Sequence, residues 1–209
     1  MAGDEVPETP HAHNEPPNAP ACLDRIFFSA RTFRAWRHEP LPTEVLHRLY
    51  DALRMGPTAN NSAPARFVFI ASQSAKDRLE PHLSEGNRAK VRAAPVCAIV
   101  AYDLDFPKTL AKLDPKRADA PAAYRAPERI EETAFRNSSL QGAYLIMAAR
   151  AMGLDCGPMS GFDRAGVDQA FFAGSNVKSN FLCCIGHGDR SSLRPRLPRL
   201  AFEDACTLL

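Results

Sequence analysis

Hydrophobic positions divide the chain into alternating helix-like and strand-like segments. Apolar residues from 43 to 55 recur three and four positions apart and end at Gly56-Pro57, which predicts an amphipathic helix. Similar spacing predicts helices near residues 21–30, 74–83, 85–93 and 164–172, and a final helix from about residue 201. Short apolar runs at 67–71, 94–102 and 180–186 predict strands, and the run at 94–102 is typical of a central strand covered on both faces. Strands separated by helices indicate a mixed α/β domain.

The longest predicted helix spans residues 128–152 and is closed by Gly153. Its apolar residues wrap much of the cylinder, and they are Ala134, Leu140, Ala143, Tyr144, Ile146, Met147, Ala148 and Ala151. A helix that is apolar nearly all round lies in the centre of a domain or packs on another subunit. This pattern favours dimerisation through the helix.

Three segments lack such periodicity. Residues 1–20 contain five prolines and almost nothing to bury, so we expect a disordered tail followed by a single domain over residues 21–209. Residues 106–127 are charged and contain four prolines, which predicts a long surface excursion able to act as a lid or a partner-contacting loop. Residues 155–162 are expected to form a loop.

Composition narrows the functional classes. The 209 residues, 45% of them hydrophobic, suffice for one domain with a substantial core. Lysine and arginine total 26 against 24 acidic residues, so the net charge of +2 gives no general field for nucleic acid or a membrane surface. No secretory signal and no apolar run of about 20 residues is present, so we expect a cytoplasmic protein without a membrane span.

Cysteine and histidine positions argue against disulfides and metal. The six cysteines are scattered, lack CxxC spacing and lie mostly in apolar runs, which indicates reduced core residues. The nearest metal-like pair, His11-x-His13, has no partner motif. We therefore expect no metal site.

The usual catalytic signatures are missing, including the nucleophile elbow, the phosphate loop, GxGxxG after a strand and HExxH. This favours a bound cofactor as the source of the reactive atom. Three segments have the residue types of an anion pocket, Arg31-Thr32-x-Arg34, Asn87-x-x-Lys90 and Arg194-Pro-Arg196. Basic residues are frequent throughout the chain, so spacing alone favours a solvated surface over a phosphate site.

Four ordered motifs resemble those of nitroreductase-like flavoproteins. The segment Arg31-Thr-Phe-Arg34-Ala-Trp36 resembles their R-S-x-R-x-F opening, and Gly56-Pro-Thr-Ala-Asn-Asn61-Ser-Ala-Pro64 resembles their P-S-S-x-N-S-x-P loop. Gly153-Leu-Asp-Cys-Gly-Pro158-Met-Ser-Gly161-Phe-Asp163 resembles G-L-x-x-x-P-x-x-G-F-D, and Arg194-Pro-Arg196-Leu-Pro198 resembles K-x-R-L-P. Without the resemblance, the third segment reads as a plain turn. Within the family the chain is most similar to the malonic semialdehyde reductase subfamily of pyrimidine breakdown.

The resemblance implies an α+β fold with a central mixed β-sheet flanked by helices, as an intertwined homodimer with FMN at the interface. It places Arg31, Thr32, Arg34, Arg194 and Arg196 around the FMN phosphate and ribityl chain, Thr58 and Asn61 on the ring or ribityl, and Asn87 and Lys90 at the pyrimidine edge. It places Pro158, Met159, Ser160 and Gly161 along the ring, with a backbone N–H directed at N5. Ala30 stands where the family often has a second arginine, so phosphate binding should depend more on Arg34, Arg194 and Arg196.

The function that the resemblance implies is hydride transfer from NADPH or NADH through FMN to a small electrophile. The first expectation is reduction of 3-oxopropanoate to the 3-hydroxy acid, with Arg66 and Arg136 as candidate carboxylate clamps. The alternatives are a general nitroreductase or quinone reductase, a flavin-binding protein without turnover, and a dimeric interaction module whose arginines bind another anion. No motif reports a preference between NADPH and NADH.

Overall fold

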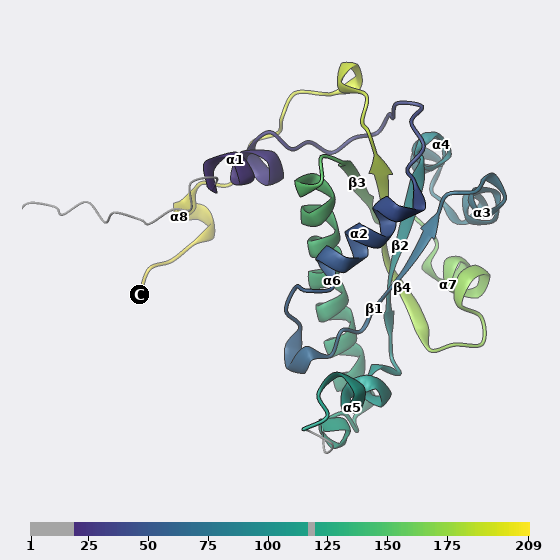
Figure 1. The fold of residues 1–209 in the computed structure, drawn as a ribbon, viewed down its shortest axis with the longest axis vertical. Coiled ribbons are helices and arrows are strands. Elements are labelled where there is room, and N and C mark those ends of the chain that lie inside the picture. Colours follow the sequence, from purple (N-terminus) through teal and green to yellow (C-terminus); the bar gives the residue numbers. More distant parts are fainter. Residues whose placement is uncertain (1–18, 117–119) are drawn as a thin grey trace, which may run out of the picture.

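A four-stranded sheet forms the centre of the protein, shown in Figure 1 as a computed structural model that describes residues 19–116 and 120–209. The strands are β1 (Ala65–Ile70), β2 (Val96–Asp103), β3 (Asp155–Met159) and β4 (Val177–Gly186), in the order β1-β2-β4-β3. The α+β fold with a central sheet between helices is confirmed. The expectation of a mixed sheet is wrong in one respect, because all three ladders are antiparallel, and the one parallel bridge in the described part joins Thr32 to Cys156.

Helices cover both faces of this sheet (Figure 1). On one face, α2 (Thr43–Leu53) and α6 (Pro127–Ala151) enclose a core that includes Leu49, Leu53 and Leu145. On the other face lie α3 (Gln73–Leu79), α4 (Glu85–Ala93) and α7 (Arg164–Phe172), whose core includes Leu79, Val91 and Val167. The helices expected over these residues are confirmed, and the sheet is buried between two layers.

Strand β2 occupies the central position that its apolar run predicts. Seven of its eight residues are buried, and it pairs with β1 on one side and β4 on the other. Its Cys97 stands opposite Cys184 of β4 on the α4 side, and Cys156 and Cys183 lie in the core under α6. These four thiols are buried core residues as expected, whereas Cys22 and Cys206 are exposed.

Residues 155–159 form an edge strand and not the loop expected from the sequence. Cys156 pairs with Ile185 of β4, and Pro158 is tolerated because it lies at the edge of the sheet. Gly157 allows the Phe33 backbone to approach this edge of the sheet closely, since a Cβ on residue 157 would stand 2.5 Å from the Phe33 carbonyl oxygen. Glycine and proline lower strand propensity, which explains why the sequence pattern misses β3.

The excursion over residues 106–127 has a small core of its own. It contains a 3-10 helix (Phe106–Thr109), α5 (Leu110–Leu113) and a 3-10 helix (Ala120–Ala123), and it returns to α6. Phe106, Leu110 and Tyr124 are buried with Tyr102 and Ala134. The segment is therefore packed onto the end of the sheet and is not a purely superficial loop.

The first and last described helices lie beside each other, away from the sheet (Figure 1). Helix α1 (Ala19–Leu23) continues as a π-helix (Asp24–Phe28), and the C-terminal segment contains the single-turn α8 (Phe202–Ala205). Further 3-10 turns lie at Ala59–Asn61, Glu80–His82 and Arg190–Ser192. The tail predicted for residues 1–20 falls almost wholly outside the described residues. No helix in the described ranges is long and apolar enough to span a membrane.

Replacement of Leu145 tests the core between α6 and the sheet. The side chain is fully buried, so Leu145→Ala should lower the free energy of unfolding by about 2–5 kcal/mol. Met55→Ala is the control, because Met55 is 78% exposed and should change stability by less than about 0.5 kcal/mol. Urea unfolding followed by circular dichroism measures both, and equal losses would contradict this packing.

Candidate functional site

The segment between residues 31 and 37 lies against the open edge of the sheet. The Phe33 amide donates to the Cys156 carbonyl at 3.1 Å, and the Arg37 amide donates to the His187 carbonyl at 2.8 Å. Phe33 and Trp36 are buried, 2% and 6% exposed, whereas Thr32 and Arg34 are exposed. The two aromatic anchors therefore fix the backbone and leave Arg31, Thr32 and Arg34 along its outer side.

The C-terminal segment crosses this backbone and brings its own arginines to it. The Nη2 of Arg196 donates to the carbonyls of Phe28 and Ala30 at 2.6 and 2.8 Å. The Arg31 guanidinium donates to the Arg194 carbonyl. Residues more than 160 positions apart thus meet through side-chain to backbone hydrogen bonds. The first and third basic segments predicted from the sequence lie together.

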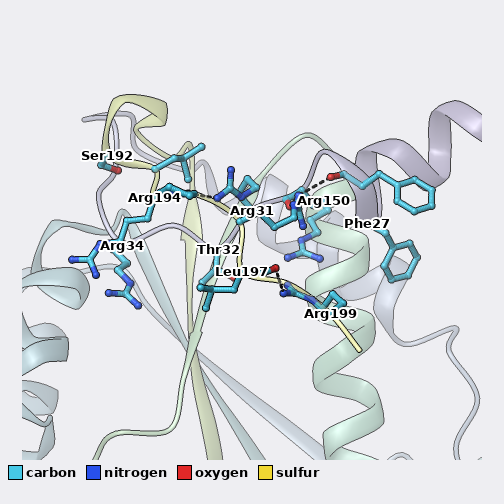
Figure 2. A pocket seen from close by; sticks show the side chains of 14 residues that line it. Phe27, Arg31, Thr32, Arg34, Arg150, Ser192, Arg194, Leu197 and Arg199 are labelled. Carbon is cyan, nitrogen blue, oxygen red and sulfur yellow. Dashed lines mark hydrogen bonds between the residues drawn. The ribbon is translucent and has the colours of Figure 1, made fainter. Parts of the chain in front are cut away.

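These segments enclose a cavity of about 760 Å³, here named the arginine pocket. Among the described residues, its lining includes six arginines and no carboxylate, and these arginines are Arg31, Arg34, Arg150, Arg194, Arg196 and Arg199. Figure 2 shows Arg34, Arg194 and Ser192 at one end of the pocket and Phe27, Arg150 and Arg199 at the other. Guanidinium groups whose positive charge no lining carboxylate balances, in a cavity of this size, suit a phosphorylated small molecule.

A second group of predicted residues adjoins the Arg34 end. Lys90 Nζ donates to Asn87 Oδ1 at 2.8 Å, and Asn87 Nδ2 donates to the Gly161 carbonyl at 2.9 Å. Partial burial, followed by the positive charges of Arg34 and Arg194, lowers the pKa of Lys90. A Cβ on Gly161 would stand 2.8 Å from Asn87 Nδ2, so a larger residue there would displace the Asn87 side chain. An anion beside Lys90 would favour its charged form.

The end of β3 and the loop after it present several predicted residues beside this group. Pro158, Ser160 and Gly161 are exposed, and Met159 is half-buried against the core. Ser84, which sequence reasoning missed, donates its hydroxyl to the Gly161 carbonyl at 2.8 Å. The Gly161 carbonyl is thereby held by two side chains from the start of α4.

Thr58 and Asn61 lie elsewhere in the chain. Their loop is tied to α6, because the Asn137 Oδ1 accepts from the Ala59 amide at 2.8 Å and Tyr144 donates to the Pro57 carbonyl at 2.8 Å. Helices α6 and α4 cover opposite faces of the sheet. The structure therefore does not bring Thr58 and Asn61 to Asn87 and Lys90 within one chain.

The backbone conformation of this loop explains why asparagines occupy positions 60 and 61. Asn60 and Asn61 have φ angles of 53° and 51°, in the left-handed region that asparagine tolerates better than most residues. Asn60 Nδ2 reaches the Tyr124 hydroxyl at 3.1 Å, and Asn61 Nδ2 reaches the Leu113 carbonyl at 3.3 Å. The excursion over residues 106–127 thus supports the loop.

Neither candidate carboxylate clamp is available in the structure. Arg66 pairs with Asp103 at 2.7 Å and also donates to two backbone carbonyls. Arg136 pairs with Glu132 on the exposed surface of α6. In contrast, Arg150 and Arg199 line the arginine pocket, although neither belongs to a motif that singled it out in the sequence. Within the described ranges, no three His, Cys, Asp or Glu residues are grouped as a metal site.

Sequence comparison places this chain in a family. The profile described as "Nitroreductase family" matches residues 28–187, most of the chain. The chain belongs to the nitroreductase family. A Stenotrophomonas maltophilia protein provisionally named NADH dehydrogenase/NAD(P)H nitroreductase is 56% identical over 189 residues, which cover 90% of this chain and 96% of that protein. A Rhodopseudomonas palustris protein of the same provisional name is 55% identical, with 90% and 95% covered.

Solved structures support the same fold. A Bacillus subtilis protein provisionally described as a nitroreductase superposes with a TM-score of 0.83 at 20% identity and covers 91% of this chain and 100% of its own. A similar Exiguobacterium sibiricum protein, solved in complex with FMN, has a TM-score of 0.80 at 20% identity and covers 90% and 97%. At such identity the likeness concerns the nitroreductase fold alone.

Inorganic phosphate tests whether the arginine pocket binds anions. At about 100 times its Kd, phosphate should stabilise the folded protein by about 2.7 kcal/mol through mass action. Arg194→Ala removes one lining guanidinium and should abolish most of this gain, whereas Arg190→Ala, outside the pocket, should keep it. Urea unfolding at constant ionic strength measures the effect. An identical phosphate response in all three proteins would exclude the pocket as the binding site.

Proposed function

We propose that this protein is an FMN-dependent oxidoreductase that uses NAD(P)H to reduce a small electrophile. The observation that carries this proposal is the arginine pocket, which has no lining carboxylate and adjoins Lys90, Asn87 and Gly161. The provisional NAD(P)H nitroreductase names of the relatives and the FMN complex of the Exiguobacterium structure agree with it.

The residues present fit FMN in charge and in shape. Arg31, Arg34, Arg194 and Arg196 offer guanidinium donors to a phosphate dianion, and Thr32 adds a hydroxyl. Beside them, Pro158, Ser160 and Gly161 are exposed, so the backbone of this segment is open to a flat ring. A phosphate site and a flat-ring site therefore adjoin in one chain.

When bound, FMN supplies the hydride-transfer chemistry between NAD(P)H and the substrate. Lys90, held by Asn87, provides a positive charge at the pyrimidine edge, where the reduced ring is electron-rich. Asn87 and Ser84 hold the Gly161 carbonyl, which orients the backbone of residues 158–161 along the ring. The protein thus contributes binding, orientation and electrostatics.

The site is completed by a second copy of the chain. Thr58 and Asn61 are separated from Lys90 and Asn87 by the sheet, so one FMN reaches all four only if a partner contributes the Thr58–Asn61 loop. Helix α6 supports this arrangement, because Phe135, Leu140 and Met147 are 44%, 43% and 36% exposed in the single chain. We therefore propose a homodimer through α6 with FMN at the interface.

Two substrate classes remain candidates. The resemblance to malonic semialdehyde reductases favours 3-oxopropanoate, but Arg66 and Arg136, the candidate clamps for its carboxylate, pair with Asp103 and Glu132. The names of the relatives favour nitro compounds, and quinones are similar oxidants. A flavin-binding protein without turnover is the alternative from another class. The cytoplasm is the proposed compartment, where unbridged cysteines are the rule.

Removal of the Arg194 guanidinium should weaken FMN binding. The loss of a charge-assisted hydrogen bond to phosphate predicts a Kd about 10- to 100-fold higher for Arg194→Ala. Arg190→Ala, four residues earlier and outside the pocket, should bind FMN as the unaltered protein does. Quenching of FMN fluorescence measures both values. An unchanged Kd for FMN in Arg194→Ala would show that the FMN phosphate does not bind in this pocket.

Heterodimers test whether two chains share one site. Asn61→Ala and Arg194→Ala chains, each defective alone, are co-expressed with different affinity tags and purified as the mixed dimer. In a shared site, one interface of that dimer combines an intact Asn61 with an intact Arg194, so FMN binding at unaltered affinity should return in one of the two sites. Absence of any restored site would mean that each chain binds FMN by itself.

The choice of substrate is tested with the reduced protein. Anaerobic NADPH should bleach the visible flavin absorbance, and addition of 3-oxopropanoate should restore it if the semialdehyde is a substrate. Restoration by a nitrofuran alone would assign the general nitroreductase function. A yellow protein that neither NADPH nor NADH bleaches would instead be a flavin-binding protein without turnover.

A further inference from the structure

The arginine pocket holds more positive charge than the FMN phosphate requires. Four of its six arginines belong to the two motifs assigned to that phosphate, which carries at most two negative charges. The remaining two, Arg150 and Arg199, lie with Phe27 at the end opposite Arg34 and Arg194 (Figure 2). This outer end of the pocket is therefore left without a ligand in the proposed function.

Arg150 is a partly buried cation without a counter-charge in the described ranges. It comes from the last turn of α6, and its Nη1 donates to the Ile26 carbonyl at 3.0 Å, which fixes the direction of the guanidinium. Its Nε is buried and has no hydrogen-bond partner among the described residues. Partial burial of an unpaired charge is costly, so a bound anion at this end would stabilise it.

The other groups at this end are an exposed arginine and aromatic rings. Arg199 Nη1 donates to the neighbouring Leu197 and Pro198 carbonyls at 2.8 and 3.1 Å, which leaves its remaining donors uncommitted in the described structure. Phe27 and Phe28 also line the pocket and are 48% and 70% exposed. A ligand that suits these arginines and aromatic rings combines a phosphate with a flat ring that stacks on phenylalanine.

We propose that the outer end binds the adenosine 2′-phosphate part of NADPH, with Arg150 and Arg199 at the phosphate and Phe27 against the adenine. The inference rests on the proposed function, because it needs FMN at the end of the pocket that holds Arg34 and Arg194, and a dinucleotide as the reductant. NADH has a hydroxyl in place of the 2′-phosphate and gains nothing from these two arginines. The pocket thus gives the enzyme a preference for NADPH.

Steady-state kinetics of the FMN-saturated protein test the preference. The ratio of kcat/KM for NADPH to that for NADH should fall about tenfold in Arg199→Ala, the effect of one exposed charged hydrogen bond, and further in the Arg199→Ala, Arg150→Lys double variant. Arg190→Ala, an exposed arginine outside the pocket, is the matched control. A ratio unchanged in both variants would overturn the proposal.

A binding measurement separates the phosphate position from general anion attraction. By calorimetry at constant ionic strength, adenosine 2′,5′-bisphosphate should bind the FMN-loaded protein at least about tenfold more tightly than ADP, and Arg199→Ala should remove the difference. Equal binding of the two nucleotides would contradict a 2′-phosphate site. Failure of the proposed function is distinguishable, because the unaltered protein would then hold no FMN or would not be reduced by either nucleotide.

Discussion

The contact between Phe33 and the glycines of the sheet edge underlies the whole site. A Cβ on Gly188 would stand 2.0 Å from Phe33 Cδ1, and one on Gly157 would stand 2.5 Å from the Phe33 carbonyl oxygen. Only glycine leaves room for the aromatic ring and its backbone at these positions. Because Phe33 is locked here, Arg31 and Arg34 on either side of it face outward beside the segment that carries Arg194 and Arg196. The placement of these arginines, which come from both ends of the sequence, therefore depends on the buried Phe33 side chain.

Concentration of arginines around this anchor has an energetic consequence. Six like charges with no carboxylate among the described lining residues repel one another, and burial together with the charges of Arg34 and Arg194 lowers the pKa of Lys90. Anionic ligands relieve that repulsion, so ligand binding and stability are coupled at this end of the molecule. Helix α6 presents another incomplete surface, its exposed apolar side chains. The proposed dimer covers this surface and brings the Thr58–Asn61 loop to the partner's pocket.

Periodicity predicted those elements in which burial dominates. Strand β2 is almost wholly apolar because it is central. The buried positions of α6 include Asn137, Ser138 and Gln141, so the apolar excess of this helix predicted its existence but not the face that packs on the sheet. Strand β3 was missed because Gly157 and Pro158 serve the close contacts of an edge. The packing of residues 106–127 was missed because Phe106 packs on Tyr124 across a charged, proline-containing stretch that has no periodic pattern. Arg150 and Arg199 escaped notice for a similar reason, since their proximity arises only when the termini meet at α6.

A crystal structure of the FMN-saturated protein would test the central claim most directly, that one flavin site is built from the arginine pocket of one chain and the Thr58–Asn61 loop of another. The account predicts the phosphate within hydrogen-bond distance of Arg194 and Arg196, with Asn61 of the partner subunit at the same flavin. A phosphate outside the arginine pocket, or a flavin contacted by residues of a single chain, would contradict it.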